Sequence, residues 1–126
     1  MATYGQSAIK HTFKAAADLS SYQYCAVKLS SGQVAMCGAG EQALGILLNK
    51  PSAAGDDALV LISGISKVKV DGNAGAISEN SFLKSDAAGK GVATTTDNPI
   101  IFAMALEASS AAGDIISCLV FPAQRY

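Results

Sequence analysis

The sequence predicts an all-β protein, a small β-barrel or β-sandwich, and three observations support this prediction. Short segments with the two-residue alternation of a half-buried strand recur along the chain, spaced roughly 8–12 residues apart. Glycine, proline, asparagine and aspartate lie between these segments, where turns are needed. A helical repeat of apolar side chains is missing, because the best match, Glu41–Asn49, is short and is bracketed by glycine and proline.

The predicted strands follow one another along the chain. The first lies in Ser7–Lys14, where Ile9, His11 and Phe13 occupy alternate positions. Two further strands flank the turn Ser30-Ser-Gly32 and are predicted to form a β-hairpin. The hairpin strands and those that follow are Tyr22–Leu29, Gln33–Cys37, Ala43–Leu48, Ala58–Ile62, Ile65–Val70, Phe82–Lys84, Gly91–Thr95, Ile100–Leu106 and Ile115–Phe121.

The middle of the chain shows the clearest alternation. In Ile65–Val70, Val68 and Val70 share one face with Ser66, and the isoleucine and the two lysines share the other. Ser63-Gly64 is predicted to end the preceding strand, because glycine within a strand pattern usually marks a break or a bulge. The sequence therefore predicts two separate strands here.

One stretch of the chain resembles a second stretch, position by position. Gly45–Leu61 and Ala103–Leu119 each contain an apolar strand, a Ser-Ala-Ala-Gly-Asp loop and another apolar strand. The loop glycines, Gly55 and Gly113, are expected to adopt a positive φ, and the aspartates after them to cap loop N–H groups. Two related hairpins in one barrel explain this similarity, and a pair of functional loops is the alternative.

Composition limits the function. The chain has 126 residues, enough for one domain, with 50% hydrophobic residues and a net charge of −1. Because the lysines and arginines are scattered, no nucleic-acid-binding surface is predicted. The longest apolar runs, such as Ile100–Leu106, are too short to cross a membrane, and the N-terminus lacks the pattern of a signal peptide.

No motif predicts a catalytic, cofactor-binding or metal-binding site. Gly38-Ala-Gly40-Glu-Gln-Ala43 fits the pattern of a dinucleotide-binding loop, but an apolar strand and Pro51 follow it instead of a helix. Neighbours on a strand point to opposite faces, so Asp56-Asp57 is not expected to share a proton or a metal. A cysteine–histidine dyad with the single histidine, His11, stays open at this stage. The three cysteines, Cys25, Cys37 and Cys118, lie in apolar stretches and are expected to be reduced core residues.

Several segments together resemble the small capsid decoration, or cement, proteins of phages. The resemblance begins with Phe13-Lys-Ala-Ala-Ala-Asp-Leu-Ser and continues through Val34-Ala-Met-Cys-Gly-Ala-Gly-Glu-Gln-Ala-Leu-Gly-Ile-Leu. It also includes both Ala-Ala-Gly-Asp loops and the closing Ile115-Ile-Ser-Cys-Leu-Val. It covers roughly residues 8–121, nearly the whole chain.

This resemblance implies a mainly β protein with a β-barrel or β-tulip-like domain over residues 15–126 and an extended N-terminal arm over residues 1–14. It implies a homotrimer on the exterior of the phage head that binds the major capsid protein and stabilises the mature shell without catalysis or a cofactor. The arm is the part expected to contact the capsid. Its candidate contact residues are Ala2, Thr3, Tyr4, Gln6, Ile9, His11 and Phe13.

Two other functions stay open. The chain could be another virion component, such as a head-fibre base or a tail-associated β-domain, and its location in the particle would distinguish these. It could also be an enzyme or a small-ligand module, for which a deep pocket with converging polar groups around His11 or the cysteines would be required.

Overall fold

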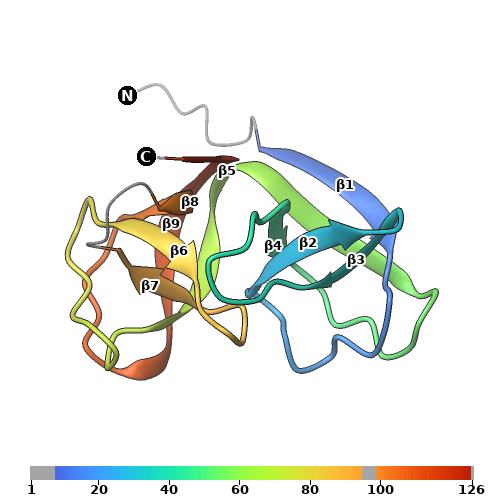
Figure 1. Ribbon diagram of the computed structural model, residues 1–126, viewed down its shortest axis with the longest axis horizontal. Coiled ribbons are helices and arrows are strands. Elements are labelled where there is room, and N and C mark those ends of the chain that lie inside the picture. Colours follow the sequence, from blue (N-terminus) through green and yellow to red (C-terminus); the bar gives the residue numbers. More distant parts are fainter. Residues whose placement is uncertain (1–7, 95–98, 126) are drawn as a thin grey trace.

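The computed structural model describes residues 8–94 and 99–125, and these form nine strands and no helix (Figure 1). The all-β prediction is therefore confirmed. The strands are β1 (Ile9–Lys14), β2 (Ala26–Ser30), β3 (Gln33–Met36), β4 (Gly45–Leu47), β5 (Asp57–Asp71), β6 (Phe82–Ser85), β7 (Gly91–Ala93), β8 (Ile100–Ala105) and β9 (Ala112–Arg125).

The long strand β5 organises the fold, because it belongs to two rings of strands. Its first half pairs with β1 on one edge and β4 on the other, and its second half pairs with β9 and, at Val70, with β7. The predicted break at Ser63-Gly64 is wrong. Gly64 has a φ of +125°, which a residue without a side chain adopts readily, so the strand is redirected there and continues.

Each ring has five strands and closes through a single parallel pair. The first ring runs β1-β5-β4-β2-β3 and closes where Ala15 pairs with Val34. The second ring runs β5-β9-β8-β6-β7 and closes where Val70 pairs with Gly91. Figure 1 shows the first ring on the right and the second on the left, with β5 in both.

The two rings are copies of one pattern, down to the residue register. The β4–β5 pairs correspond to the β8–β9 pairs, and the hairpin β2–β3 corresponds to the hairpin β6–β7. The corresponding pairs are Ile46↔Leu61 and Met104↔Leu119, Leu47↔Val60 and Ala105↔Cys118, Ala26↔Ile46 and Phe82↔Met104, Val27↔Met36 and Leu83↔Ala93, and Lys28↔Ala35 and Lys84↔Val92.

Local backbone geometry repeats as well. Tyr24 and Asn80 precede β2 and β6, and both have a positive φ, 67° and 72°. Their N–H groups donate to the carbonyls of Leu47 and Ala105, at 2.7 and 2.8 Å. The chain is thus an internal duplication of a five-stranded unit. The sequence showed only its most similar part, and the two predicted hairpins lie in different rings instead of in one barrel.

The two Ser-Ala-Ala-Gly-Asp segments differ, because the first is a loop as predicted, whereas residues 112–114 of the second belong to β9, with Gly113 at a register shift opposite β5. Gly55 and Gly113 have φ values of 89° and 82°, as expected. Asp56 accepts a hydrogen bond from the N–H of Ser52 at 3.3 Å, which is the predicted capping contact. Asp114 accepts instead from the hydroxyl of Ser109, at 2.7 Å. The start of β9 is thus held by a side-chain contact in place of the predicted N–H cap.

The start of the predicted strand Tyr22–Leu29 is a turn in the structure, and β2 begins at Ala26. The positive φ of Tyr24 is incompatible with a strand. Its N–H and carbonyl bond to Leu47 and to Lys69, so tertiary contacts outweigh the strand preference of tyrosine.

The described residues form two hydrophobic cores, and one of them contains residues from both rings. The smaller core fills the first ring and includes Leu19, Val27 and Val60. The larger core fills the second ring and also takes in buried residues of the first, among them Ile46 and Leu61. Backbone bonds reinforce the junction, since Ala26 N–H donates to Gly89 O at 2.7 Å and Gly40 N–H to Ser85 O at 2.9 Å. The described residues therefore pack as one unit.

Candidate functional site

The three cysteines are buried, whereas the single histidine is exposed. Cys25, Cys37 and Cys118 are buried and free, which confirms their prediction as reduced core residues. Burial raises the pKa of all three thiols, that of Cys118 to about 12, so they stay protonated at neutral pH and are poor nucleophiles. His11 is exposed on β1, where its ring packs edge-on against Phe13 with 4.7 Å between centroids. This arrangement gives no support to a cysteine–histidine dyad.

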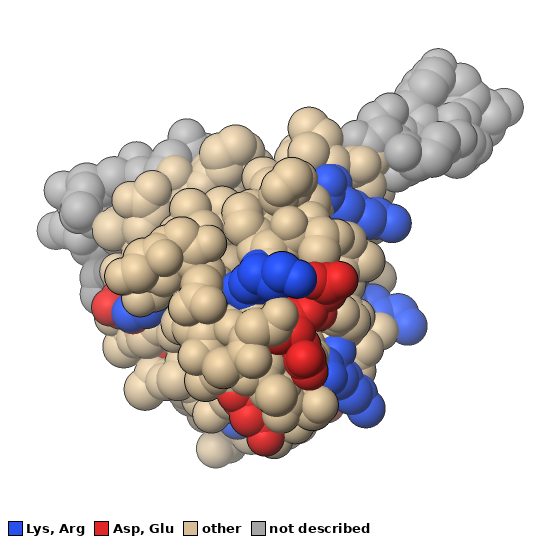
Figure 2. All heavy atoms as spheres, turned by 90° about the vertical axis from the view of Figure 1, so that its right-hand side faces the viewer, with Lys and Arg blue, Asp and Glu red and all other residues tan. Residues whose placement is uncertain are grey.

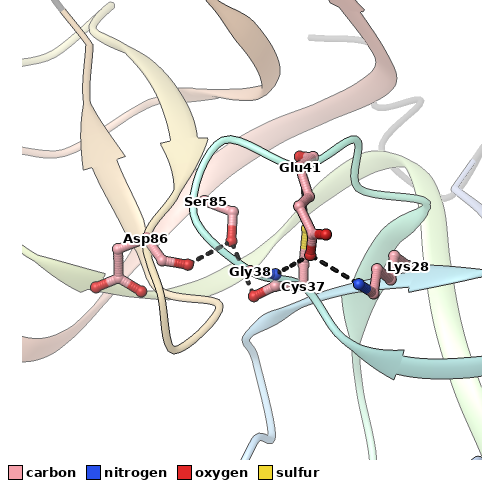
Figure 3. A network of polar contacts seen from close by, with 6 residues as sticks. All are labelled: Lys28, Cys37, Gly38, Glu41, Ser85 and Asp86. Carbon is pink, nitrogen blue, oxygen red and sulfur yellow. Dashed lines mark hydrogen bonds and ion pairs between the residues drawn. The ribbon is translucent and has the colours of Figure 1, made fainter.

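The loop that matches a dinucleotide-binding pattern is filled by its own carboxylate (Figure 3). Glu41 Oε1 accepts from the N–H of Gly38 at 2.7 Å and from Nζ of Lys28 at 2.8 Å. The side-chain bond from Lys28 is the main cause that lowers the pKa of Glu41. Because Glu41 occupies the N–H that a phosphate would need, and β4 follows instead of a helix, the loop is a structural turn.

The same loop joins the two rings. The buried hydroxyl of Ser85, at the end of β6, lies 3.3 Å from the carbonyl oxygen of Cys37 and 3.0 Å from that of Asp86 (Figure 3). The network in Figure 3 therefore runs from β2 through the loop after β3 to the second ring, and its geometry indicates a structural role.

Replacing Glu41 with Gln is expected to lower the thermal midpoint at pH 7, with a smaller difference from wild type at about pH 3. A carboxylate whose pKa is lowered by folding stabilises the protein above its unfolded pKa, and this stabilisation is lost as the pH falls through the folded pKa. Thermal melts followed by circular dichroism at both pH values measure this. Glu79→Gln, at an exposed position, is the control, and a deficit that is equal at both pH values would refute the assignment.

The adjacent acids point to different partners. Asp57 pairs with Nζ of Lys14 at 2.7 Å, whereas Asp56 accepts from Ser52, as predicted for neighbours that do not share a site. Within residues 8–94 and 99–125, no group of three or more histidine, cysteine, aspartate or glutamate side chains is placed to hold a metal.

The last part of the predicted arm is a strand of the domain. Ala2, Thr3, Tyr4 and Gln6 lie outside the described residues. The other three candidate residues, Ile9, His11 and Phe13, lie in β1, which pairs with β5 from Ile9↔Ser63 to Lys14↔Asp57. The predicted boundary after residue 14 therefore falls at the end of a strand of the first ring. The alternation that identified Ile9, His11 and Phe13 reflects this pairing.

The outer face of β5 and β9 carries exposed apolar side chains that the sequence prediction did not assign to a site. Ile65 and Leu119 lie directly opposite each other on the two strands, and Ile115 is further along β9. Their exposed fractions are 56%, 37% and 49%. We call these three residues the β5–β9 patch. The alternation in Ile65–Val70 already placed Ile65 on the face opposite Val68. The sequence did not predict that β9 would pair with this strand and place Leu119 beside Ile65.

Charge is sparse on the side of the molecule formed by the first ring. Figure 2 shows small groups of acidic and basic side chains close together on an otherwise uncharged surface. Two ion pairs between described residues contribute to this, Lys14 with Asp57 and Lys28 with Glu41. This face carries no basic stripe of the kind that binds a nucleic-acid backbone. No helix among the described residues has the length and hydropathy needed to cross a membrane.

Comparison with known proteins gives a family match and a fold likeness. A family model described as a phage cement protein matches residues 3–120. The structure of the head fiber gp8.5 N base in bacteriophage phi29 is similar, with a TM-score of 0.62 and 15% sequence identity over 94% of this chain and 99% of that one. No curated protein matches the chain. At this identity the phi29 structure establishes the fold only, whereas the family match spans nearly the whole sequence.

Proposed function

Because the chain belongs to the phage cement protein family, and is therefore a structural protein of the phage head on the capsid exterior, we propose that it binds the mature shell as a homotrimer and stabilises it. The family match over nearly the whole chain is the observation that carries this proposal. The buried, protonated thiols and the self-filled glycine loop are consistent with a role without catalysis.

Binding only to the assembled shell would stabilise it by linkage. A ligand that binds one state and not another shifts the equilibrium toward the bound state by RT ln(1 + [L]/Kd). A trimer would attach to the shell at three points, and each contact after the first is intramolecular, so weak individual contacts would give strong overall binding.

The β5–β9 patch supports the homotrimer. Exposed apolar side chains that lie opposite each other on paired strands are candidates for burial in a contact between copies. Ile65 and Leu119 face each other directly on the surface, and Lys67 and Lys69 share that face of β5, so a contact between copies would bury the apolar pair beside these lysines. The capsid-binding part remains the N-terminal segment, with residues 2–7 followed by the exposed strand β1.

A binding assay with cognate mature shells stripped of this protein tests the proposal. The wild-type chain should be a trimer by light scattering, should sediment with the shells, and should raise the temperature at which they break. Deletion of residues 2–7 should weaken binding and leave the fold intact, since it spares β1. A monomer that ignores the shells would overturn the proposal, and unchanged binding by the deletion variant would overturn the role of the N-terminal segment.

The likeness to the phi29 structure favours a second candidate, the base of a head fibre. In that case an extended projection would stand on this domain. Electron micrographs of the virion would distinguish the two, because a fibre base would carry an extended projection and a cement protein would not.

A further inference from the structure

The two rings differ at the outer edge of their first strands. In the second ring, the first strand is the second half of β5, and Lys69 on its free edge donates its N–H to the carbonyl of Tyr24 at 2.8 Å. Tyr24 belongs to the first ring, so the earlier copy covers the edge of the later one. Among the described residues, no earlier segment makes the equivalent bond in the first ring, so within residues 8–94 and 99–125 the corresponding edge of its first strand, β1, is open.

The hydrogen-bond pattern identifies the open groups. Ala15 N–H donates to Asp56 O at 2.8 Å, and bonding alternates along an antiparallel pair, so the backbone groups of Thr12 and Lys14 point away from β5. The carbonyl of Lys14 lies at the parallel Ala15↔Val34 bridge with β3, so the open carbonyl is that of Thr12. Leu59, opposite Thr12, bonds instead to Leu48 of the β4 side, which agrees with this alternation. Among the described residues, β1 joins β3 only at its end, where Ala16 N–H donates to Val34 O at 2.8 Å.

The side chains around this edge are also open. Every residue of β1 except Phe13 is exposed, and Ile9 is 58% exposed. Lys10, Thr12 and Lys14 share one face of the strand, and Ile9, His11 and Phe13 share the other. β1 carries two lysines and no acid, and only Lys14 has an ion-pair partner within the described residues, Asp57.

We propose that the free edge of β1 accepts an extended strand from a capsid subunit, with a carboxylate beside Lys10 and an apolar side chain beside Ile9; this rests on the proposed function. An added strand would bond to the outward N–H and C=O groups and bury Ile9. A second copy of the chain is a poor occupant, because pairing two β1 edges would bring lysines together, and edge lysines are a common protection against such self-association. The N-terminal segment thus serves as the receiving strand.

Two variants test this proposal with stripped cognate shells, in the full-length protein. Thr12→Pro removes one outward N–H at a position where the β1–β5 bonds remain, and Thr12→Ala retains that N–H as the matched control. Lys10→Glu reverses the charge, with Lys10→Arg as its control. We expect Thr12→Pro and Lys10→Glu to bind about tenfold more weakly than wild type, and both controls to bind as wild type does. On binding, the amides of Thr12 and Lys14 should gain protection from hydrogen exchange.

The outcomes separate the two proposals. Thermal melts verify that each variant is folded, and Lys10→Glu keeps the test decisive if Thr12→Pro unfolds. Wild-type binding with no loss in either folded variant would overturn the strand-addition proposal and leave the proposed function standing. If Lys10→Glu instead changes the oligomeric state and leaves shell binding intact, a second copy occupies the edge and the proposal is wrong. Failure of the wild type to bind any shell would contradict the proposed function itself.

Discussion

Replacing Leu83 with Ala is expected to lower the free energy of unfolding by about 2–5 kcal/mol. Leu83 is fully buried on β6, and its side chain lies close to Gly91 of β7, which offers no atoms to fill a cavity. Urea unfolding followed by circular dichroism and tyrosine fluorescence measures this, since the chain has no tryptophan. The control, Leu29→Ala, removes a leucine that is 52% exposed and should change stability by only about 0.5 kcal/mol.

The unfolding curve of Leu83→Ala should also remain a single transition. The larger core contains residues from both rings, and β5 is a strand of each, so a cavity in the second ring destabilises the first as well. A curve with two separated transitions, or a loss no greater than that of Leu29→Ala, would contradict the description of the two rings as one packed unit.

Replacing Gly45 with Ala is expected to cost about 1–3 kcal/mol of stability, although alanine occupies the corresponding position of the other ring. A methyl group on Gly45 would lie against the carbonyl oxygen of Leu61 and Cγ1 of Val60, and a backbone oxygen in a paired strand has little freedom to move. Its counterpart, Ala103 on β8, is fully buried and already accommodates its side chain. The clash thus belongs to the packing of the first ring.

The reciprocal change gives the comparison. Ala103→Gly is expected to cost about 1–2 kcal/mol, because it removes a buried methyl group and increases backbone freedom without adding a clash. Urea unfolding of both variants measures the difference. A Gly45→Ala variant as stable as wild type would contradict the predicted clash with the carbonyl oxygen of Leu61.

Local signals in the sequence were sufficient for the strands and hairpins. The turn at Ser30-Ser-Gly32 and the alternation in Ile65–Val70 depend on neighbouring residues, and both appear in the structure as predicted. The failures arise where distant contacts decide. Gly64 continues β5 because other strands pair with it on both sides of that glycine, and Tyr24 leaves the strand because its backbone bonds to Leu47 and Lys69.

The duplication was only partly visible for a similar reason. The segments after β4 and β8 keep the same Ser-Ala-Ala-Gly-Asp residues, whereas elsewhere the two copies share hydrogen-bond register more than residue identity. Register is a property of paired strands and leaves little trace in a single chain. The closing pairs, Ala15 with Val34 and Val70 with Gly91, join residues far apart in the sequence and have no local signature.

The sequence identified the buried cysteines but not the surfaces proposed for binding. The buried state of the three cysteines followed from their apolar neighbours, and the structure confirms it. The exposed edge of β1 did not follow, because the same alternation fits a free arm and a paired strand. The β5–β9 patch required knowledge that Leu119 lies opposite Ile65. The assignment to the phage head depends on family membership, which no single residue reveals.

An electron cryomicroscopy reconstruction of cognate shells, with and without added protein, tests the central claim most directly. The proposed function predicts added density on the outer surface at threefold or quasi-threefold positions, three copies to a site, with shells that resist heat better than undecorated ones. Added density at a vertex or tail alone, or shells that bind the protein and break at an unchanged temperature, would contradict it.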